Sequence, residues 1–198
     1  MSAKRELNVL IQKIHANHTS IGSVLAWSGF LLQHGCRATD DSFAQFIEAL
    51  KVNTTLTYVD LGENELDDSD AKCIADVLKV NTTIESISLY RNQIGGAGVS
   101  YIAEALKLNN TLNRIDFWRN HIGLDGAVQI AEALNENTTL SCLILADNRI
   151  GDAGMKHIAD MLKVNKTLTI LGLRRNQIGD AGIRDFAEVL KVNSTLNG

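Results

Sequence analysis

The side chains of this chain that are able to do chemistry are few and widely spaced. Its histidines form no HExxH motif and have no acidic partner at a useful spacing: His15, His18, His34, His121 and His157. Its cysteines are far apart, odd in number and without a CxxC pair, which argues against a disulfide framework or a zinc site: Cys36, Cys73 and Cys142. The sequence also has no Walker loop and no GxGxxG motif. We therefore expect no catalytic residue, no metal and no cofactor, and we predict that the chain is not an enzyme.

Aromatic and arginine residues in the middle of the chain are better candidates for a site. Tyr90 and Trp118 lie 28 residues apart, and each is followed directly by an arginine, Arg91 or Arg119. Trp, Tyr and Arg are the residue types enriched where a protein surface contributes most to binding. Whether these four side chains share one surface depends on the elements that carry them.

Those elements follow a strict internal repeat. Asparagine recurs every 28 residues in two columns: Asn53, Asn81, Asn109, Asn137, Asn165 and Asn193 in one, and Asn64, Asn92, Asn120, Asn148 and Asn176 in the other. Five full units, from 53–80 to 165–192, cover 140 of the 198 residues. We expect the first column to shape a turn, and the second to bond the backbone of neighbouring units as a ladder.

Each unit has a strand half and a helix half. In the third unit, Ile115 and Phe117 alternate with polar residues, which is the period of a strand. The second half of each unit changes to helical period, and in the last full unit the predicted inward face comprises Ile183, Phe186, Ala187 and Leu190. Asp152 and Asp180 stand where helix N-caps are expected. Acidic residues three positions before lysines indicate a solvated outer face on these helices.

One strand and one helix cannot bury their own apolar faces, whereas stacked units can. The segments "TIESISLYRNQI", "TLNRIDFWRNHI" and "TLTILGLRRNQI" resemble leucine-rich repeats. The 28-residue length and the helical half "GDAGMKHIADMLKVN" are similar to the ribonuclease-inhibitor-like subclass, which includes NOD-like receptor sensor repeats and Ran GTPase-activating protein repeats. The resemblance implies an α/β solenoid, a right-handed βα superhelix with a parallel sheet on the concave side and helices on the convex side.

The two ends of the chain depart from the repeat. Residues 1–52 are expected to form a degenerate N-terminal capping repeat, and 193–198 to begin an incomplete sixth repeat. An amphipathic helix is predicted from Ala3 to Ala16. The following segment echoes the strand half, with Ile21, Val24 and Ala26 in the apolar columns and an enlarged loop near 28–40. A helical hairpin over Ile21 to Gln33 is the alternative.

Side chains on the open face of the sheet do not pack in the hydrophobic core. Strand alternation places a set of polar, charged and aromatic residues there, and these are the candidate binding residues: Tyr58, Asp60, Tyr90, Arg91, Arg114, Asp116, Trp118, Arg119, Arg174 and Arg175. Strand spacing near ~4.8 Å would let the rings of Tyr90 and Trp118 touch. The competing interpretation is that the rings only stack on each other and on the arginines to cover the sheet.

These residues favour a non-enzymatic module that binds a protein partner of unknown identity on the concave face. A GTPase-activating domain is the alternative that the resemblance to Ran GTPase-activating protein implies. A nucleic-acid binder using the arginines and stacked aromatics is disfavoured, because the formal net charge is −4.

The remaining expectations concern location and assembly. No apolar run reaches the length of a membrane span, and we expect no membrane partner. The scattered cysteines favour a reducing, cytoplasmic location, or a host cytosol if the chain is a bacterial effector. We expect a monomer, with self-association possible through the uncapped C-terminal edge.

Overall fold

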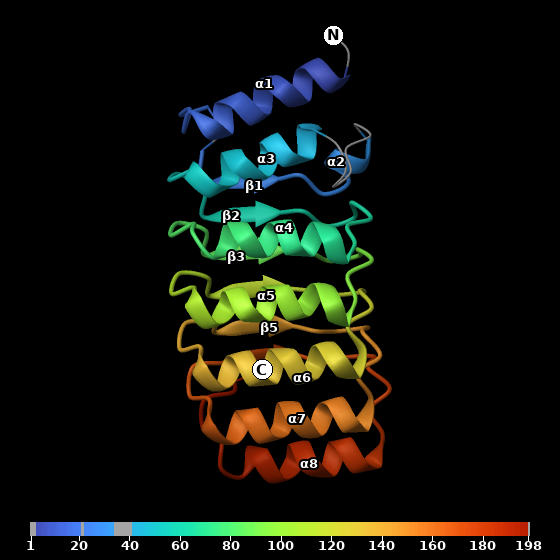
Figure 1. Ribbon diagram of the computed structural model, residues 1–198. Helices are drawn as coiled ribbons and strands as arrows, with labels where there is room; N and C mark the ends of the chain where they lie inside the picture. The colour runs from blue at the N-terminus through green and yellow to red at the C-terminus, as the bar shows by residue number, and fades with distance from the viewer. Residues whose placement is uncertain (1–2, 21, 34–40, 198) are drawn as a thin grey trace.

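The computed structural model describes residues 3–20, 22–33 and 41–197 as a stack of strand–helix units (Figure 1). The strands are β1 (Val24–Ala26), β2 (Tyr58–Asp60), β3 (Ser86–Ser88), β4 (Arg114–Asp116), β5 (Cys142–Ile144) and β6 (Ile170–Gly172). The helices are α1 (Ala3–His15), α2 (Phe30–Gln33), α3 (Asp41–Val52), α4 (Asp68–Leu78), α5 (Gly96–Leu108), α6 (Gly123–Glu136), α7 (Gly151–Val164) and α8 (Asp180–Leu190). The order of elements is that of an α/β leucine-rich repeat solenoid.

The strands form one parallel sheet in the order β1-β2-β3-β4-β5-β6. From β2 to β6, each residue pairs with the residue 28 positions later, as Tyr58 does with Ser86 and Ser86 with Arg114. The helices α3 to α8 stand side by side in a single layer in front of the strands (Figure 1). The opposite face of the sheet is the surface that we call the open sheet face.

The core lies between the sheet and the helix layer. Its middle column is one aliphatic residue per strand, and all of these residues are buried: Leu25, Val59, Ile87, Ile115, Leu143 and Leu171. The helices contribute the expected inward positions, such as Val99 and Leu106 on α5. Removing apolar surface from water stabilises the folded state by about 25 cal/mol per Å2. This continuous aliphatic layer is therefore the main stabilising contribution.

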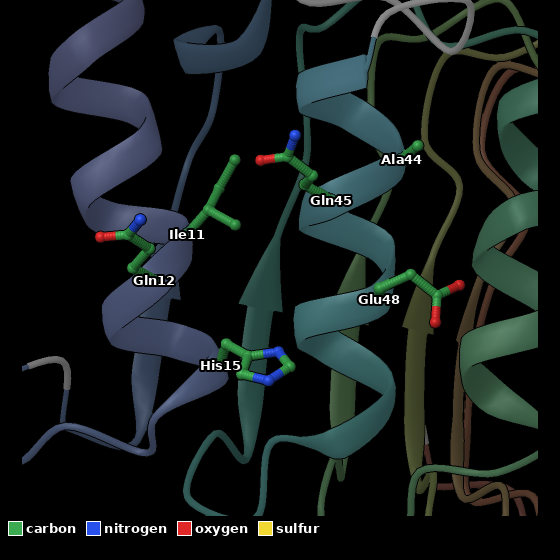
Figure 2. Close-up of a pocket in the computed structure, with 6 residues that line it drawn as sticks. All are labelled: Ile11, Gln12, His15, Ala44, Gln45 and Glu48. Carbon is green, nitrogen blue, oxygen red and sulfur yellow. The ribbon is translucent and has the colours of Figure 1, made fainter.

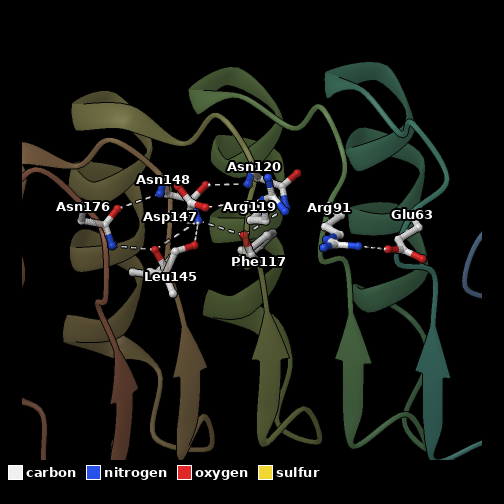
Figure 3. A network of polar contacts seen from close by, with 10 residues as sticks. Glu63, Arg91, Phe117, Arg119, Asn120, Leu145, Asp147, Asn148 and Asn176 are labelled. Carbon is white, nitrogen blue, oxygen red and sulfur yellow. Dashed lines mark hydrogen bonds and ion pairs between the residues drawn. The ribbon is translucent and has the colours of Figure 1, made fainter.

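The two asparagine columns are buried and bonded as predicted. In the strand-end column, each Nδ2 donates to a carbonyl of the preceding unit, at 2.9 Å from Asn120 to Leu89 O and 2.8 Å from Asn148 to Phe117 O. In the other column, Oδ1 of Asn81 accepts from the backbone N–H groups of Thr83 and Ile84 and so closes a turn. Figure 3 shows the strand-end column running across three units.

The strand register at β1 differs from the prediction by one residue. Leu25 pairs with Val59 and is 4% exposed, while Val24 is 53% exposed. Trp27, which follows the strand, is also buried and stacks on Phe46. A one-residue shift turns every side chain of a strand to the other face. The predicted apolar columns at Val24 and Ala26 were therefore wrong, because the larger residues Leu25 and Trp27 take the core positions.

The predicted N-caps at Asp152 and Asp180 were also wrong. The N-caps are Ile150 for α7 and Gly179 for α8. The Asp152 carboxylate instead accepts from the backbone N–H groups of Gly179 and Gly182, at 2.6 and 3.1 Å, in the unit that follows. Asp68 accepts from Gly95 N in the same way at 2.6 Å. These carboxylates therefore cap the next helix rather than their own, and they tie neighbouring units together.

The predicted inward face of the last helix is largely exposed. Ile183 is 57% exposed and Leu190 is 49% exposed, whereas the equivalent Val99 and Leu106 of α5 are buried. The backbone position is the same, but α5 is flanked by α4 and α6, and α8 packs against α7 alone in the described chain. Burial of these positions therefore depends on the following unit and not on the helix that carries them.

The remaining sequence predictions for the N-terminal region are met in part. Helix α1 buries Leu7, Ile11 and Ile14, and α3 buries Phe43 and Phe46, as expected. The alternative of a helical hairpin over Ile21 to Gln33 was wrong, because the described part of this range contains strand β1 and only the short helix α2. Helix α2 lies within the range of the predicted loop near 28–40. Residues 34–40 and Ile21 lie outside the described residues.

On the other helices, the acid–lysine pairs at a spacing of three form ion pairs, for example 2.7 Å between Glu104 and Lys107.

Replacing Asn148 by Ala should lower the free energy of unfolding by about 3 kcal/mol, because the buried backbone N–H groups of Asn120 and Ile122 in the preceding unit would lose their acceptor. Nδ2 of Asn148 donates to Phe117 O, and its Oδ1 accepts from Asn120 N. Denaturant unfolding measures the loss, and Asn110→Ala is the matched control because Asn110 is exposed. Equal stability of the two variants would contradict the ladder's structural role.

Candidate functional site

The sheet register places the predicted site residues along the open sheet face and its edge. Tyr58 and Asp60 lie on β2, and Arg114 and Asp116 lie on β4 in the same two columns. The other residues follow their strands directly: Tyr90 and Arg91 after β3, Trp118 and Arg119 after β4, Arg174 and Arg175 after β6. The structure therefore gathers most of them around β3 to β6, while Tyr58 and Asp60 lie four strands from the last arginines.

The two aromatic rings form a stacked pair. The ring centroids of Tyr90 and Trp118 are 6.1 Å apart, with 21° between the ring planes. The Tyr90 ring lies over Gly62, where any Cβ atom would overlap the ring. The Tyr90 hydroxyl is 2.7 Å from Ser28 Oγ. Both rings are half-buried, so each keeps part of its surface available to a partner.

Arginines flank the aromatic pair. The guanidinium carbon of Arg91 lies 5.1 Å from the Trp118 ring centroid, and that of Arg119 lies 5.8 Å away. Each arginine also pairs with a carboxylate of a neighbouring unit, Arg91 with Glu63 and Arg119 with Asp147 (Figure 3). These cation–π contacts and ion pairs fix the position of the two arginines against the Trp118 ring and surround the ring with charged groups.

A hollow of about 380 Å3 opens beside Trp118. Its lining combines apolar and charged side chains: Arg114, Asp116, Trp118, Ile144, Ala146, Arg174 and Arg175. Arg114 Nη1 donates to Cys142 Sγ at 3.0 Å. Burial raises the pKa of the Cys142 thiol, so the sulfur stays protonated and is not an activated nucleophile.

Asp116 is the one carboxylate in this hollow. Its Oδ1 accepts from the backbone N–H of Trp118 at 2.9 Å. Burial raises the pKa of Asp116, although the bond from Trp118 and the charge of Arg114 oppose that rise. On β2, burial and then the Asp60 carboxylate raise the pKa of Tyr58. Asp60 accepts from Gly62 N at 2.9 Å, so both aspartates brace the loop after their strand.

The residue just before each strand-end asparagine adopts a left-handed backbone. The φ angles of this column are 57° at Glu63, 51° at Arg91, 55° at Arg119, 60° at Asp147 and 58° at Arg175. A left-handed backbone favours Gly or Asn and costs other residues roughly 1–2 kcal/mol. Charged side chains therefore occupy positions at which the fold alone would favour a smaller residue.

The candidate set omitted several residues of this face. Glu63 and Asp147 pair with the arginines, and Ile144 and Ala146 line the hollow. The 28-residue columns place all four on the open face or its edge, so their position was predictable and their contacts were not. Ser28 had no such signal, because it precedes the regular repeats.

A second hollow, of about 420 Å3, lies between α1 and α3, remote from the sheet face (Figure 2). It is lined by Ile11, Gln12, His15, Ala44, Gln45 and Glu48. It has no aromatic side chain other than the imidazole of His15 and no arginine, so it shares nothing with the cluster around Trp118.

Among the residues that the structure describes, no group of three or more His, Cys, Asp or Glu side chains is arranged to hold a metal ion. No helix there is long and apolar enough to cross a lipid bilayer.

Comparison with known proteins agrees with this architecture. The family model described as "Leucine Rich repeat" matches residues 52–75, 80–103, 136–159 and 164–187. The chain belongs to the leucine-rich repeat family, and its units are of the ribonuclease-inhibitor-like type. No curated protein matches it by sequence.

Two solved structures are similar to most of this chain. "Leiomodin-1 Actin-Binding Site 2 (ABS2)" is 30% identical, with a TM-score of 0.64, over 78% of this chain and 86% of that one. The tropomodulin C-terminal domain of Caenorhabditis elegans is 13% identical, with a TM-score of 0.61, over 78% of this chain and 93% of that one. The second likeness concerns the fold alone.

Replacing Asp116 by Asn should raise the free energy of unfolding at neutral pH. The amide oxygen still accepts from Trp118 N, while the desolvated charge is removed. Because the folded-state pKa is raised, Asp116 favours the folded state most below its unfolded pKa and loses that contribution as pH rises through the folded pKa. The gain of the variant over the wild type should therefore grow from about pH 3 to about pH 6.

Unfolding curves across this pH range check the sign. Asp160→Asn is the control, because the hydrogen bond from Lys163 lowers the pKa of Asp160 and its pH trend should be opposite and small. A gain for Asp116→Asn that shrinks as pH rises would contradict the account.

Replacing Arg175 by Asn should raise the free energy of unfolding by roughly 0.5–1 kcal/mol, because asparagine tolerates the left-handed backbone better. Arg175 has φ 58° and an exposed side chain, so little packing is lost. Denaturant unfolding at neutral pH measures the change, with Arg184→Asn in α8 as the control at a right-handed position. A loss of stability for Arg175→Asn would show that its side chain stabilises the fold.

Proposed function

We propose that this chain is a non-enzymatic module that binds a protein partner through the open sheet face. The observation that carries the proposal is the stacked pair of Tyr90 and Trp118, flanked by Arg91 and Arg119. Half-buried aromatics held by arginines are typical of residues that dominate a binding interface. The sheet supplies a rigid platform, so few degrees of freedom are lost when a partner docks.

The competing interpretation gives the rings a covering role only. Against it, the rings rest on Gly62 and on each other rather than on a buried apolar layer, and the core behind them is complete without them. Charged residues in the left-handed column also favour a role beyond folding. Both observations support binding as the reason for this surface composition.

Actin is the first partner to test. The leiomodin-1 structure is that of its actin-binding site 2, and this chain is 30% identical to it over most of both chains. Residues 1–52 would serve as a capping repeat that closes the solenoid, and 53–192 would be the binding array. The free thiols of Cys73 and Cys142 suit a cytoplasmic location for such a module.

The test is capture of purified actin, and of proteins from lysate with mass-spectrometric identification, by wild type and by Tyr90→Ala/Trp118→Ala. A partner bound by the open sheet face should lose about 30-fold or more in affinity for the double variant. Tyr101→Ala is the matched control, because Tyr101 is an aromatic residue that is 42% exposed on α5 in the helix layer.

Circular dichroism and unfolding curves establish that all three proteins fold equally. Equal capture of every partner by wild type and by the double variant would overturn the proposal. Loss with Tyr101→Ala instead would place the binding surface on the helix layer.

A further inference from the structure

The hollow beside Trp118 concentrates positive charge. Arg114, Arg174 and Arg175 line it, against the single carboxylate of Asp116. Three arginines and one carboxylate leave a local excess of about two positive charges, in a chain whose formal net charge is −4. The hollow is thus opposite in sign to the molecule as a whole.

Two other arginines of this face are paired with carboxylates. Arg91 pairs with Glu63, and Arg119 pairs with Asp147 at 3.5 Å. No carboxylate of the described residues forms an ion pair with the three arginines of the hollow. Their guanidinium groups are exposed and keep most of their donors for a ligand, since the bond of Arg114 to Cys142 uses one.

The rest of the lining is apolar. The indole of Trp118 and the side chains of Ile144 and Ala146 form the walls between the arginines. The volume of about 380 Å3 lies at the small end of the range of ligand pockets. Such a space suits an apolar side chain of a bound peptide, with acidic neighbours reaching the arginines on either side.

We propose that this hollow binds an acidic peptide segment of the protein partner, in which a carboxylate side chain lies next to an apolar one. The carboxylate pairs with Arg174 and Arg175, in the fork geometry that guanidinium groups offer. The apolar side chain packs on Trp118 and Ile144. This inference rests on the proposed function and adds the chemistry of the partner.

A nucleic acid fits the same face less well. Asp116 lies in the hollow, and Asp147 and Glu63 lie along the edge of the face. A phosphate backbone that followed this face would meet these carboxylates, whereas a short acidic segment is confined to the hollow. Charge complementarity therefore favours the peptide.

The experiment selects a displayed random-peptide library on the folded wild-type chain. Enriched peptides are then measured individually against wild type and two variants, Arg174→Gln/Arg175→Gln and Arg114→Gln/Arg174→Gln/Arg175→Gln. The charge-matched control is Lys72→Gln/Lys156→Gln/Arg184→Gln, whose three residues are exposed on helices. Single-stranded oligothymidylate is titrated in parallel.

We expect enriched peptides to carry Asp or Glu beside an apolar residue, and to bind the triple hollow variant at least about tenfold more weakly. The control variant should bind these peptides with the same affinity as wild type, and a higher salt concentration should lower that affinity. Enrichment without acidic residues, no enrichment at all, equal binding to the hollow variants, or tighter binding of the oligonucleotide would overturn the inference.

The experiments distinguish a failure of this inference from a failure of the proposed function. A protein partner lost by Tyr90→Ala/Trp118→Ala but kept by the triple hollow variant would leave the proposed function standing and refute the acidic segment. A partner kept by both variants would refute both proposals.

Discussion

The burial of polar backbone in the turns between strands and helices is the constraint on which the structure depends. Each strand spans three residues, so much of each unit's backbone lies outside regular ladders. Buried N–H and C=O groups without partners would cost about 1–3 kcal/mol each. The side chains of Asn120 and Asn148 satisfy these groups across unit boundaries, and they do so only when consecutive units are in register. The need for consecutive units to be in register keeps the period constant at 28 residues, and this period sets the pairing of the strands in the sheet.

In the same arrangement, the side chains on one face of the sheet are not needed for packing in the core. Inward positions such as Ile115 and Phe117 are fully buried, while their neighbours on the other face have no layer of helices to pack against. The identity of Trp118 and Arg114 is therefore set by something other than the core. Short, rigid strands also hold these side chains at fixed spacing, which lowers the entropy lost when a partner binds.

The sequence was sufficient to predict the parts that repeat. The strand and helix positions of the five full units, the asparagine ladder and the proximity of Tyr90 to Trp118 all follow from periodicity. The errors arose where a residue depends on another unit. Asp152 caps the next helix, and Leu190 is exposed because no further described helix packs against it. At β1 the repeat is degenerate, and the choice between Val24 and Leu25 for the core needed the register itself.

The candidate site follows the same division. The columns identified which side chains share the open face, but not which of them pair. Arg91 and Arg119 form ion pairs, whereas the arginines that line the hollow form none with the described residues: Arg114, Arg174 and Arg175. This distinction depends on side-chain geometry. The hollow itself combines residues of three units, which no single unit encodes.

The central claim is that a protein partner covers the open sheet face, and hydroxyl-radical footprinting tests it most directly. Trp118 and Tyr90 on that face and Tyr101 on α5 are reactive, partly exposed side chains. With a captured partner bound, oxidation of Trp118 and Tyr90 should fall several-fold while that of Tyr101 stays constant. Unchanged oxidation of Trp118, with protection of Tyr101, would contradict the claim and assign binding to the helix layer.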